Sequence, residues 1–140
     1  MDIEKSDFSF LGHKIIDVSM KVGDNIVSDN LGLNINCEGG LDYEKQLFVL
    51  TMKVHVEDSE KVLNIDVKAE GYFKYQGENL EQLLGFIGIN SPALLFPYIR
   101  SFISMLTSIS GLKTVTLPTL NLSNIGKKLA DNLKKELEQK

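Results

Sequence analysis

Residues 91–111 read SPALLFPYIRSFISMLTSISG, and this stretch decides how the rest of the chain folds. Ser91 and Pro92 are typical of the N-cap and the first position of a helix, and Gly111 is typical of a helix end. Apolar residues occupy most sides of this helix, whereas a helix that covers one sheet needs a single apolar face. Pro97 lies inside it, where its ring removes a backbone hydrogen bond and either kinks or restarts the helix. We therefore predict a helix that is packed on two sides.

The apolar residues of this helix exceed what one sheet can cover. They form three adjoining stripes, which are Leu95, Ile99, Phe102, Leu106 and Ile109, then Leu94, Tyr98 and Met105, and then Phe96 and Ile103. If the surplus were exposed, it would form a patch larger than monomers usually tolerate. We therefore predict an oligomer built through this helix. Tyr98, Phe102 and Met105 are the predicted interface residues, with packing against the sheet as the alternative role.

Four stretches before residue 76 alternate apolar and polar residues with a period of two, which is typical of strands with one buried face. The predicted inward-facing residues are Ile16, Val18, Met20 and Val22, then Leu31, Leu33, Ile35 and Cys37, then Phe48, Leu50, Met52, Val54 and Val56, and then Leu63, Ile65, Val67 and Ala69. Residues 58–60 fit a hairpin connection, and Gly39 and Gly40 fit the end of the second strand. The pattern predicts an antiparallel meander.

The remaining segments predict helices and a loop beside that sheet. Residues 78–86 favour a short helix or helical turn, after which Ser91 starts the long helix. Residues 112–122 indicate a long apolar loop or an edge segment. A final helix is capped by Ser123 or by Asn124. Its apolar positions are Ile125, Leu129, Leu133 and Leu137, and its other faces are charged, so it is predicted to be an amphipathic surface helix.

Length and composition fit one domain. With 140 residues and 43% hydrophobic content, the chain is long enough for one sizeable core and too short for two comfortable ones. We predict a single domain over residues 1–140 with an α+β fold. In this fold a four-stranded antiparallel meander sheet has a long helix packed on one face, and a C-terminal amphipathic helix follows.

Charge and cysteine usage disfavour several partners and locations. The formal charge is −4, from 15 basic and 19 acidic side chains, and the basic residues are scattered, which disfavours nucleic acid as a partner. The first residues, MDIEKSDFSF, carry acids where a secretory signal needs bases. No apolar run approaches the roughly 20 residues that span a bilayer. Because Cys37 is alone, nothing implies an oxidising compartment. We expect a cytoplasmic protein without membrane insertion.

The sequence contains no convincing catalytic or metal-binding pattern. His13 and His55 are far apart in the sequence and have no second ligand at a suitable spacing, so we predict no metal site. Cys37 is best interpreted as a small buried apolar residue, because a nucleophile would need a nearby base. The carboxylates are dispersed rather than paired in a pocket-like setting. We therefore predict that the protein is not an enzyme and needs no cofactor.

The helix sequence also resembles a known family. Residues 92–100 read PALLFPYIR and are followed by Ile103-Ser104, Gly111, and then Leu117, Leu120, Asn121 and Leu122. This pattern resembles the SecB export chaperone family, whose signature reads LFPYAR, followed by a helix, a Gly-Phe-Pro loop and a Pro-Val-Asn-Phe segment. The order of elements is similar to that family over nearly the whole chain. The strand region resembles it in pattern more than in residues.

The resemblance implies a function and a set of site residues. It implies a cytosolic, ATP-independent holdase, a homotetramer that assembles as a dimer of dimers and binds unfolded polypeptides, including preproteins for export. The grooves of the family are formed by a crossover loop and the final helix beside the sheet. The corresponding client-binding residues of this chain are Leu83, Phe86, Ile87, Ile89, Leu112, Val115, Leu117, Leu120, Leu122 and Ile125.

The chain departs from the family pattern in its loop, its C-terminus and its charged sheet surface. Leu112 and Lys113 follow Gly111 where the family has Phe-Pro, and a Lys-rich helix replaces the acidic tail. The acidic surface that docks the translocase motor SecA in the family corresponds here to Asp17 and Asp66, but its third acidic position falls on Lys21. A charge reversal there would repel a basic partner.

Three alternatives to an export chaperone therefore stay open. One is a SecB-like chaperone of a toxin–antitoxin system, the second is a non-catalytic protein that binds a small apolar ligand, and the third is a structural oligomer without a client. Broad binding to denatured proteins distinguishes the chaperones from the other two.

Overall fold

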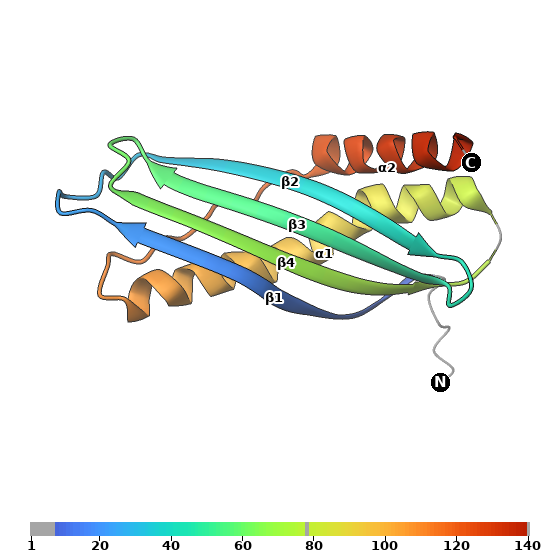
Figure 1. Cartoon of the computed structure of the whole chain (residues 1–140), viewed down its shortest axis with the longest axis horizontal. Coiled ribbons are helices and arrows are strands. Elements are labelled where there is room, and N and C mark those ends of the chain that lie inside the picture. The colour runs from blue at the N-terminus through green and yellow to red at the C-terminus, as the bar shows by residue number, and fades with distance from the viewer. Residues whose placement is uncertain (1–7, 78, 140) are drawn as a thin grey trace.

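The chain forms one antiparallel sheet, a long helix across one face of it and a shorter helix along one edge. The computed structural model describes residues 8–77 and 79–139. Its elements are β1 (Phe8–Val22), β2 (Leu31–Asp42), β3 (Leu47–Asp58), β4 (Leu63–Tyr75), α1 (Leu80–Ile109) and α2 (Ser123–Glu138). Figure 1 shows α1 running behind the sheet and α2 lying on the β2 side. The predicted α+β fold is confirmed, with a four-stranded antiparallel sheet, a long helix and a C-terminal helix.

The strand order differs from a simple meander. The order is β1-β4-β3-β2, so β2, β3 and β4 follow one another as predicted, whereas β1 pairs with β4. Residues 23–30 make this possible because they cross the end of the β3–β4 hairpin. The amide of Gly23 donates to the carbonyl of Val62 at 2.8 Å, and the amide of Ser59 donates to the carbonyl of Asn30 at 2.9 Å. The result is a Greek-key order.

Asp58 ties this crossing segment to the hairpin. Its side chain is buried, and its two carboxylate oxygens accept hydrogen bonds from the amides of Ser28 and Leu63, each at 2.9 Å. Burial raises the pKa of Asp58, but the hydrogen bonds from backbone amides outweigh it and hold the pKa below its ordinary value. The carboxylate is therefore stabilised in its charged form.

The predicted inner face is confirmed on β3 and β4, and a bulge changes it on β1. The core residues Phe48, Leu50, Met52, Val54, Val56, Leu63, Ile65, Val67 and Ala69 are at most 2% exposed. On β1 the register shifts between Ile15, which pairs with Ala69, and Asp17. Ile16 is thus the extra residue of a β-bulge and is 43% exposed, so its predicted place on the inner face is wrong.

β2 does not end at its glycine pair. It continues through Gly39 and Gly40 to Asp42, so the predicted break there is wrong. A Cβ atom on Gly39 would come within 2.7 Å of the ring of Phe48 and within 3.3 Å of the side chain of Leu129. The glycine is needed because it leaves room for both side chains, and it does not interrupt the strand.

α1 is one helix of 30 residues, so the predicted separate helix before Ser91 is wrong. The side chain of Asn79 caps its start by accepting from the amide of Gln82 at 3.1 Å. Ser91 is buried inside the helix, where its hydroxyl donates to the carbonyl of Ile87. Pro97 is also internal, and the chain remains helical through it. Packing holds the two parts in line because the stripe of Leu95, Ile99 and Ile103 is fully buried on the sheet.

The two helices meet at a pair of glycines. A Cβ atom on Gly88 would lie 2.9 Å from the carbonyl oxygen of Gly126, and one on Gly126 would overlap the carbonyl of Gly88. Pro92 has no N–H, so that carbonyl lacks its usual intrahelical donor. The backbones of α1 and α2 therefore touch directly at this crossing, with no side chain between them.

The loop between the helices is held by polar side chains of α1. Arg100 donates from Nε to the carbonyl of Leu117 at 2.5 Å, and the hydroxyl of Ser104 donates to the carbonyl of Val115 at 2.9 Å. The amide of Val115 in turn donates to the hydroxyl of Thr107 at 2.9 Å. Residues 113–122 are an irregular loop, as predicted.

α2 is amphipathic as predicted, but its cap differs. Leu122 is the N-cap and makes no side-chain cap hydrogen bond. Ser123 is already helical, and both its amide and its hydroxyl donate to the side-chain oxygen of Asn121, so its predicted N-cap role is wrong. The predicted apolar positions face inward, with Leu129 and Leu133 buried and Ile125 and Leu137 half-buried.

Candidate functional site

A groove runs between the edge strand β2 and helix α2. Its first part has a volume of about 700 Å³. Ile35 and Cys37 of β2 and Ile125 and Leu129 of α2 contribute its apolar surface. The groove forms because β2 is at the end of the strand order, so α2 packs beside an edge and not over a continuous sheet.

The groove continues toward the C-terminal end of α2. A second hollow of about 420 Å³ shares Cys37, Glu38, Leu129 and Asn132 with the first and adds Leu133. Its rim carries charges of both signs, from Lys53, Lys127, Lys128, Lys135, Glu38, Asp131 and Glu136. An apolar floor, a mixed rim and a strand edge make a site that suits an extended chain of varied sequence.

Cys37 contributes to this groove as an apolar side chain. Burial raises the pKa of its thiol to about 12. Because the thiolate is the reactive form, a thiol with such a pKa stays protonated near neutral pH and is a poor nucleophile. This agrees with the interpretation of Cys37 as an apolar residue and not a nucleophile, but Cys37 is half-buried at the groove and not fully buried as predicted.

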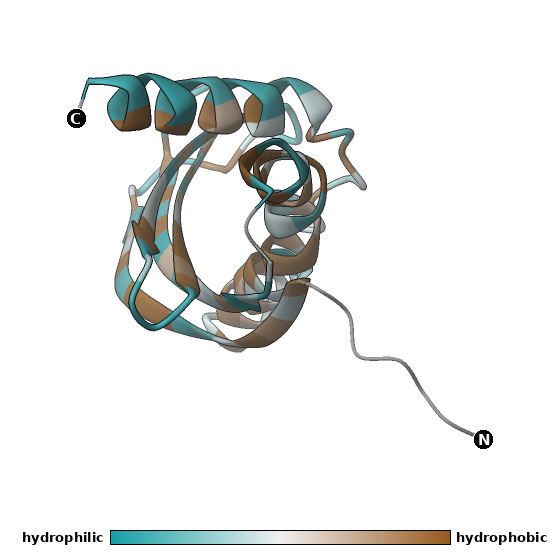
Figure 2. Cartoon of the chain, turned by 90° about the vertical axis from the view of Figure 1, so that its right-hand side faces the viewer, coloured by the Kyte–Doolittle hydropathy of each residue, from teal (hydrophilic) through white to brown (hydrophobic). Residues whose placement is uncertain are grey.

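A second candidate site is the exposed apolar face of α1 and β1. Leu94, Tyr98, Met105 and Ile109 of α1 are 40–77% exposed, and β1 adds Val18 and Val22. Figure 2 shows the contrast between the helices, because α2 is hydrophilic on its outward side whereas α1 is hydrophobic around most of its circumference. α1 is long and apolar enough to cross a membrane, but half of its most apolar window is buried on the sheet. The exposed half has no cover within the part of the chain that the structure describes.

Tyr98 links this face to β1. Its ring stacks on His13 with the ring centroids 4.1 Å apart and contacts Phe10 at 5.7 Å. Of the three predicted interface residues, Tyr98 and Met105 are exposed on this face, whereas Phe102 is half-buried and packs against the core.

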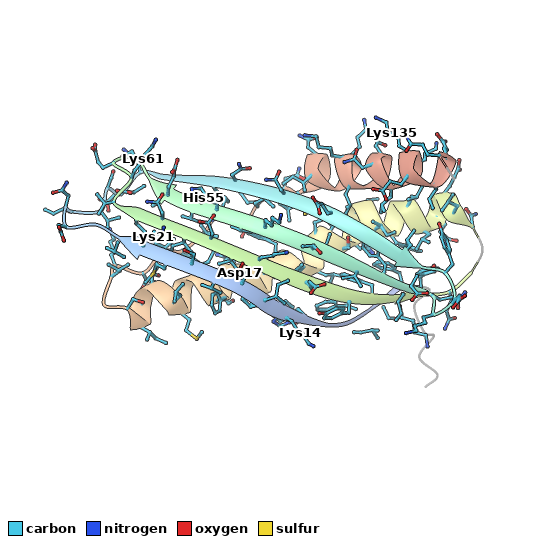
Figure 3. All side chains as sticks on the ribbon, in the orientation of Figure 1. Lys14, Asp17, Lys21, His55, Lys61 and Lys135 are labelled. Atoms are coloured by element: carbon cyan, nitrogen blue, oxygen red, sulfur yellow. The ribbon has the colours of Figure 1, made fainter. Side chains whose placement is uncertain are left out.

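The outer face of the sheet is polar and mixed in charge. Asp17 and Asp66 line one hollow of about 400 Å³ together with Lys53 and Lys68. Figure 3 labels Asp17, Lys14, Lys21 and His55 on this face. Within residues 8–77 and 79–139, no three histidine, cysteine or acidic side chains are grouped so as to hold a metal ion.

His55 interacts with the acidic residues of this face. Its Nδ1 lies 2.8 Å from Asp66 and its Nε2 lies 3.3 Å from Glu57. The pKa of His55 is raised above its ordinary value, chiefly by the hydrogen bond with Asp66; burial opposes this, and the hydrogen bond with Glu57 adds to it. A protonated His55 partly neutralises the acidic character of this surface.

Comparison with known proteins identifies the family. Residues 16–130 match the family model described as preprotein translocase subunit SecB. The chain belongs to the SecB family. A protein-export protein SecB of Chelativorans sp. is 30% identical over 87 residues, which are 62% of this chain and 51% of that protein. The match therefore spans about half the length of that relative.

Two further proteins are similar to this SecB-family chain. An uncharacterized protein of Methanocaldococcus jannaschii is 27% identical over 104 residues, covering 69% of this chain and 67% of that protein. Among solved structures, a SecB-like chaperone of Mycobacterium tuberculosis in complex with a ChAD peptide from the HigA1 antitoxin superposes with a TM-score of 0.70. It is 20% identical and covers 82% of this chain and 88% of its own, so this likeness concerns the fold.

The residues that the SecB resemblance implies as client-binding are spread over several places. Leu83, Ile87, Val115 and Leu117 are buried in the core, Phe86, Leu112, Leu120, Leu122 and Ile125 are half-buried, and Ile89 is 76% exposed. Only Ile125 lines the groove between β2 and α2. Residues 80–89 are helical here and not a loop, and this places Leu83, Leu84 and Ile87 in the core.

Sequence reasoning missed most of the residues that line the groove. Ile35, Cys37 and Leu129 were predicted only as core positions, and the structure places them where β2 and α2 leave a gap. The spacing of apolar residues in β2 and α2 indicates only that these side chains face inward. This spacing does not indicate that β2 is an edge strand, because the position of β2 in the sheet depends on which strand β1 pairs with.

Proposed function

We propose that this SecB-family protein is a non-catalytic, ATP-independent holdase that binds unfolded polypeptides in the groove between β2 and α2. The observation that carries this proposal is an apolar floor beside an edge strand. An extended client can place apolar side chains against Ile35, Cys37 and Leu129 while its backbone approaches the strand edge. A small-ligand site would instead be more enclosed, with converging polar groups.

We further propose that copies of the protein associate through the exposed face of α1 and β1. Support comes from the exposed Tyr98 and Met105, with Phe102 beneath them. Association would remove this apolar surface from water. A dimer of dimers in the cytoplasm, as in the SecB family, is the assembly that we expect.

The charges on the outer face of the sheet bear on which pathway supplies the clients. Asp17 and Asp66 share their hollow with Lys53 and Lys68, and Lys21 follows on β1. A basic partner such as SecA would meet several like charges there, so we expect weak docking to SecA. Preproteins for export remain the first candidate clients. Antitoxins are the second, because the structurally similar chaperone of Mycobacterium tuberculosis was solved with an antitoxin peptide.

The proposal is tested by the aggregation of a chemically denatured client without ATP, with light scattering reporting the mass of the chaperone. The native protein should suppress aggregation at a stoichiometric ratio. Ile125→Lys should weaken suppression, because it places a charge in the groove at a half-buried position. Leu137→Lys is the matched control, since this half-buried residue of α2 lies outside the groove lining. Absence of suppression with several clients would refute the holdase proposal.

A further inference from the structure

A separate pocket lies at the end of the sheet where β2 begins. One wall is the crossing segment between β1 and β2, and the other is residues 112–116, which follow α1. Figure 1 shows the crossing segment and the C-terminal end of α1 at the same end of the molecule. The volume is about 290 Å³, and the pocket shares no residue with the groove between β2 and α2. We call it the crossing pocket. Its apolar lining consists of Val27, Leu31, Leu63, Leu112 and Val115.

One ion pair joins the two walls of the crossing pocket. Nζ of Lys113 lies 3.2 Å from a carboxylate oxygen of Asp29, and both residues line the pocket. Both side chains are 85% exposed whereas Val115 is 6% exposed, so the pair lies on the solvent side of the pocket. Within the part of the chain that the structure describes, no other hydrogen bond or ion pair joins the two walls. Lys113 stands where the SecB family has proline, so this pair is a feature of this chain.

Each wall is otherwise attached to its own neighbours. The amide of Ser28 in the crossing segment donates to the carboxylate of Asp58 at 2.9 Å. On the other wall, the amide of Val115 donates to the hydroxyl of Thr107 at 2.9 Å. Neither of these bonds crosses the pocket. The walls can therefore separate at their solvent side by breaking the ion pair, without the loss of a backbone hydrogen bond.

The crossing pocket continues the apolar side of the edge strand β2. Leu31, Ile35 and Cys37 point to the same side of this strand because their spacing is even. Leu31 lines the crossing pocket, whereas Ile35 and Cys37 line the groove beside α2. Four residues of a strand span about 13 Å, so an extended client on the edge of β2 reaches both places. Leu112 and Val115, which the SecB resemblance implies as client-binding residues, meet in this pocket.

We propose that the ion pair between Asp29 and Lys113 is a latch on the crossing pocket. In the free protein the pair holds the two walls together, and it breaks when an apolar side chain of an extended client enters between them. The latch thus lowers the affinity of the pocket for its occupant. Because an ion pair between exposed side chains is weak, the factor is about two to five. This inference rests on the proposed holdase function and adds control by ionic strength to it, because salt screens exposed charges.

The test is the affinity of the crossing pocket for N-acetyl-phenylalaninamide, an uncharged probe with one aromatic ring. Its binding is followed through the amide NMR signals of Leu112 and Val115. At low ionic strength Lys113→Gln should bind the probe about two- to fivefold more tightly than the native protein. The double variant Asp29→Lys with Lys113→Asp restores a pair of opposite charges and should bind like the native protein. Lys45→Gln is the matched control, because it removes an exposed lysine at the other end of β2 and should change nothing.

Ionic strength gives a second measurement. Raising NaCl from about 20 to about 200 mM should tighten binding to the native protein and leave Lys113→Gln nearly unchanged, which narrows the difference between them. Equal affinity of the two proteins at low ionic strength overturns the latch. Weaker binding by Lys113→Gln also overturns it, because the lysine would then contact the probe. A probe that shifts neither signal in any of these proteins rules out the pocket.

The holdase function is decided separately by the aggregation of a denatured client. If the native protein gives no protection, the holdase proposal fails, and the probe still decides whether the pair closes the pocket. If it protects the client and the affinities for the probe are equal, the holdase proposal stands and the latch alone is refuted.

Discussion

At the scale of single residues, Asp58 determines where the chain crosses the end of the sheet. Its carboxylate binds the amide of Ser28 from the crossing segment and the amide of Leu63 from β4. Without this carboxylate, the amides of Ser28 and Leu63 would lose the acceptor that they share at the end of the sheet. One buried carboxylate thus ties the crossing segment, 30 residues away in the sequence, to both strands of the β3–β4 hairpin.

Asp58→Ala should destabilise the protein, because two backbone amides lose their acceptors. The pKa of Asp58 is lowered by folding, so its contribution is present above the pKa of an unfolded aspartate, about 3.9, and is lost as the pH falls through the folded value. Urea unfolding between pH 3 and 7 should therefore show a smaller loss of stability on acidification in Asp58→Ala than in the native protein. Asp29→Ala is the control, since this residue is exposed. An equal acid dependence of native protein and Asp58→Ala would contradict this role.

At the scale of elements, the glycine pair at the helix crossing sets the position of α2. Gly88 and Gly126 let the two helices touch through their backbones, and α2 forms one wall of the groove. The carbonyl of Gly88, which lacks an intrahelical donor because residue 92 is proline, faces Gly126 of the other helix and not a side chain. The width of the groove therefore depends on a contact that lies outside the groove.

Gly126→Ala should move α2 away from α1, because the new methyl group overlaps the carbonyl of Gly88. We expect a loss of about 1–3 kcal/mol in the free energy of unfolding and weaker client binding. Gly85→Ala is the matched control: it is also a helical glycine, but its Cβ would meet open space, so stability should rise by up to about 1 kcal/mol. Urea unfolding and the aggregation assay measure both effects. Similar behaviour of the two variants would show that the crossing does not determine the groove.

At the scale of the whole molecule, the uncovered side of α1 is the basis of the proposed assembly. Leu94, Tyr98, Met105 and Ile109 would remain in water if the protein were a monomer. The sheet covers only one side of the helix, and α2 covers β2 and the first part of α1. A second copy of the chain is therefore the proposed cover.

Met105→Glu should dissociate the proposed oligomer, because it puts a charge into an apolar interface. The fold should remain, since Met105 is 51% exposed in the single chain. Light scattering should report a lower mass than that of the native protein, and circular dichroism should be unchanged. Ser108→Glu, at an exposed position of the same helix, should leave the mass as it is. An unchanged mass in Met105→Glu would rule out this face as the interface.

The sequence by itself determined the buried faces of β3, β4 and α2. Alternation in β3 and β4 and the spacing of Leu129 and Leu133 in α2 predict their inner sides correctly, because burial imposes a period on each element separately. The LFPYIR segment was sufficient to identify the family, which the match over residues 16–130 confirms.

Only the tertiary structure decided the strand order, the helix crossing and the groove. β1 pairs with β4, and the segment that leads from β1 to β2 is held at the sheet end by the hydrogen bonds of Asp58. α1 continues through Pro92, where it packs on the sheet and on α2. The sequence predicts Gly39 as a strand end and does not single out Gly126. Their actual roles appear only in the structure, where the ring of Phe48 lies close to Gly39 and the backbone of Gly88 lies close to Gly126. Periodicity records which side of an element is buried. It does not record which distant element covers that side, because this choice is made by contacts between segments far apart in the chain.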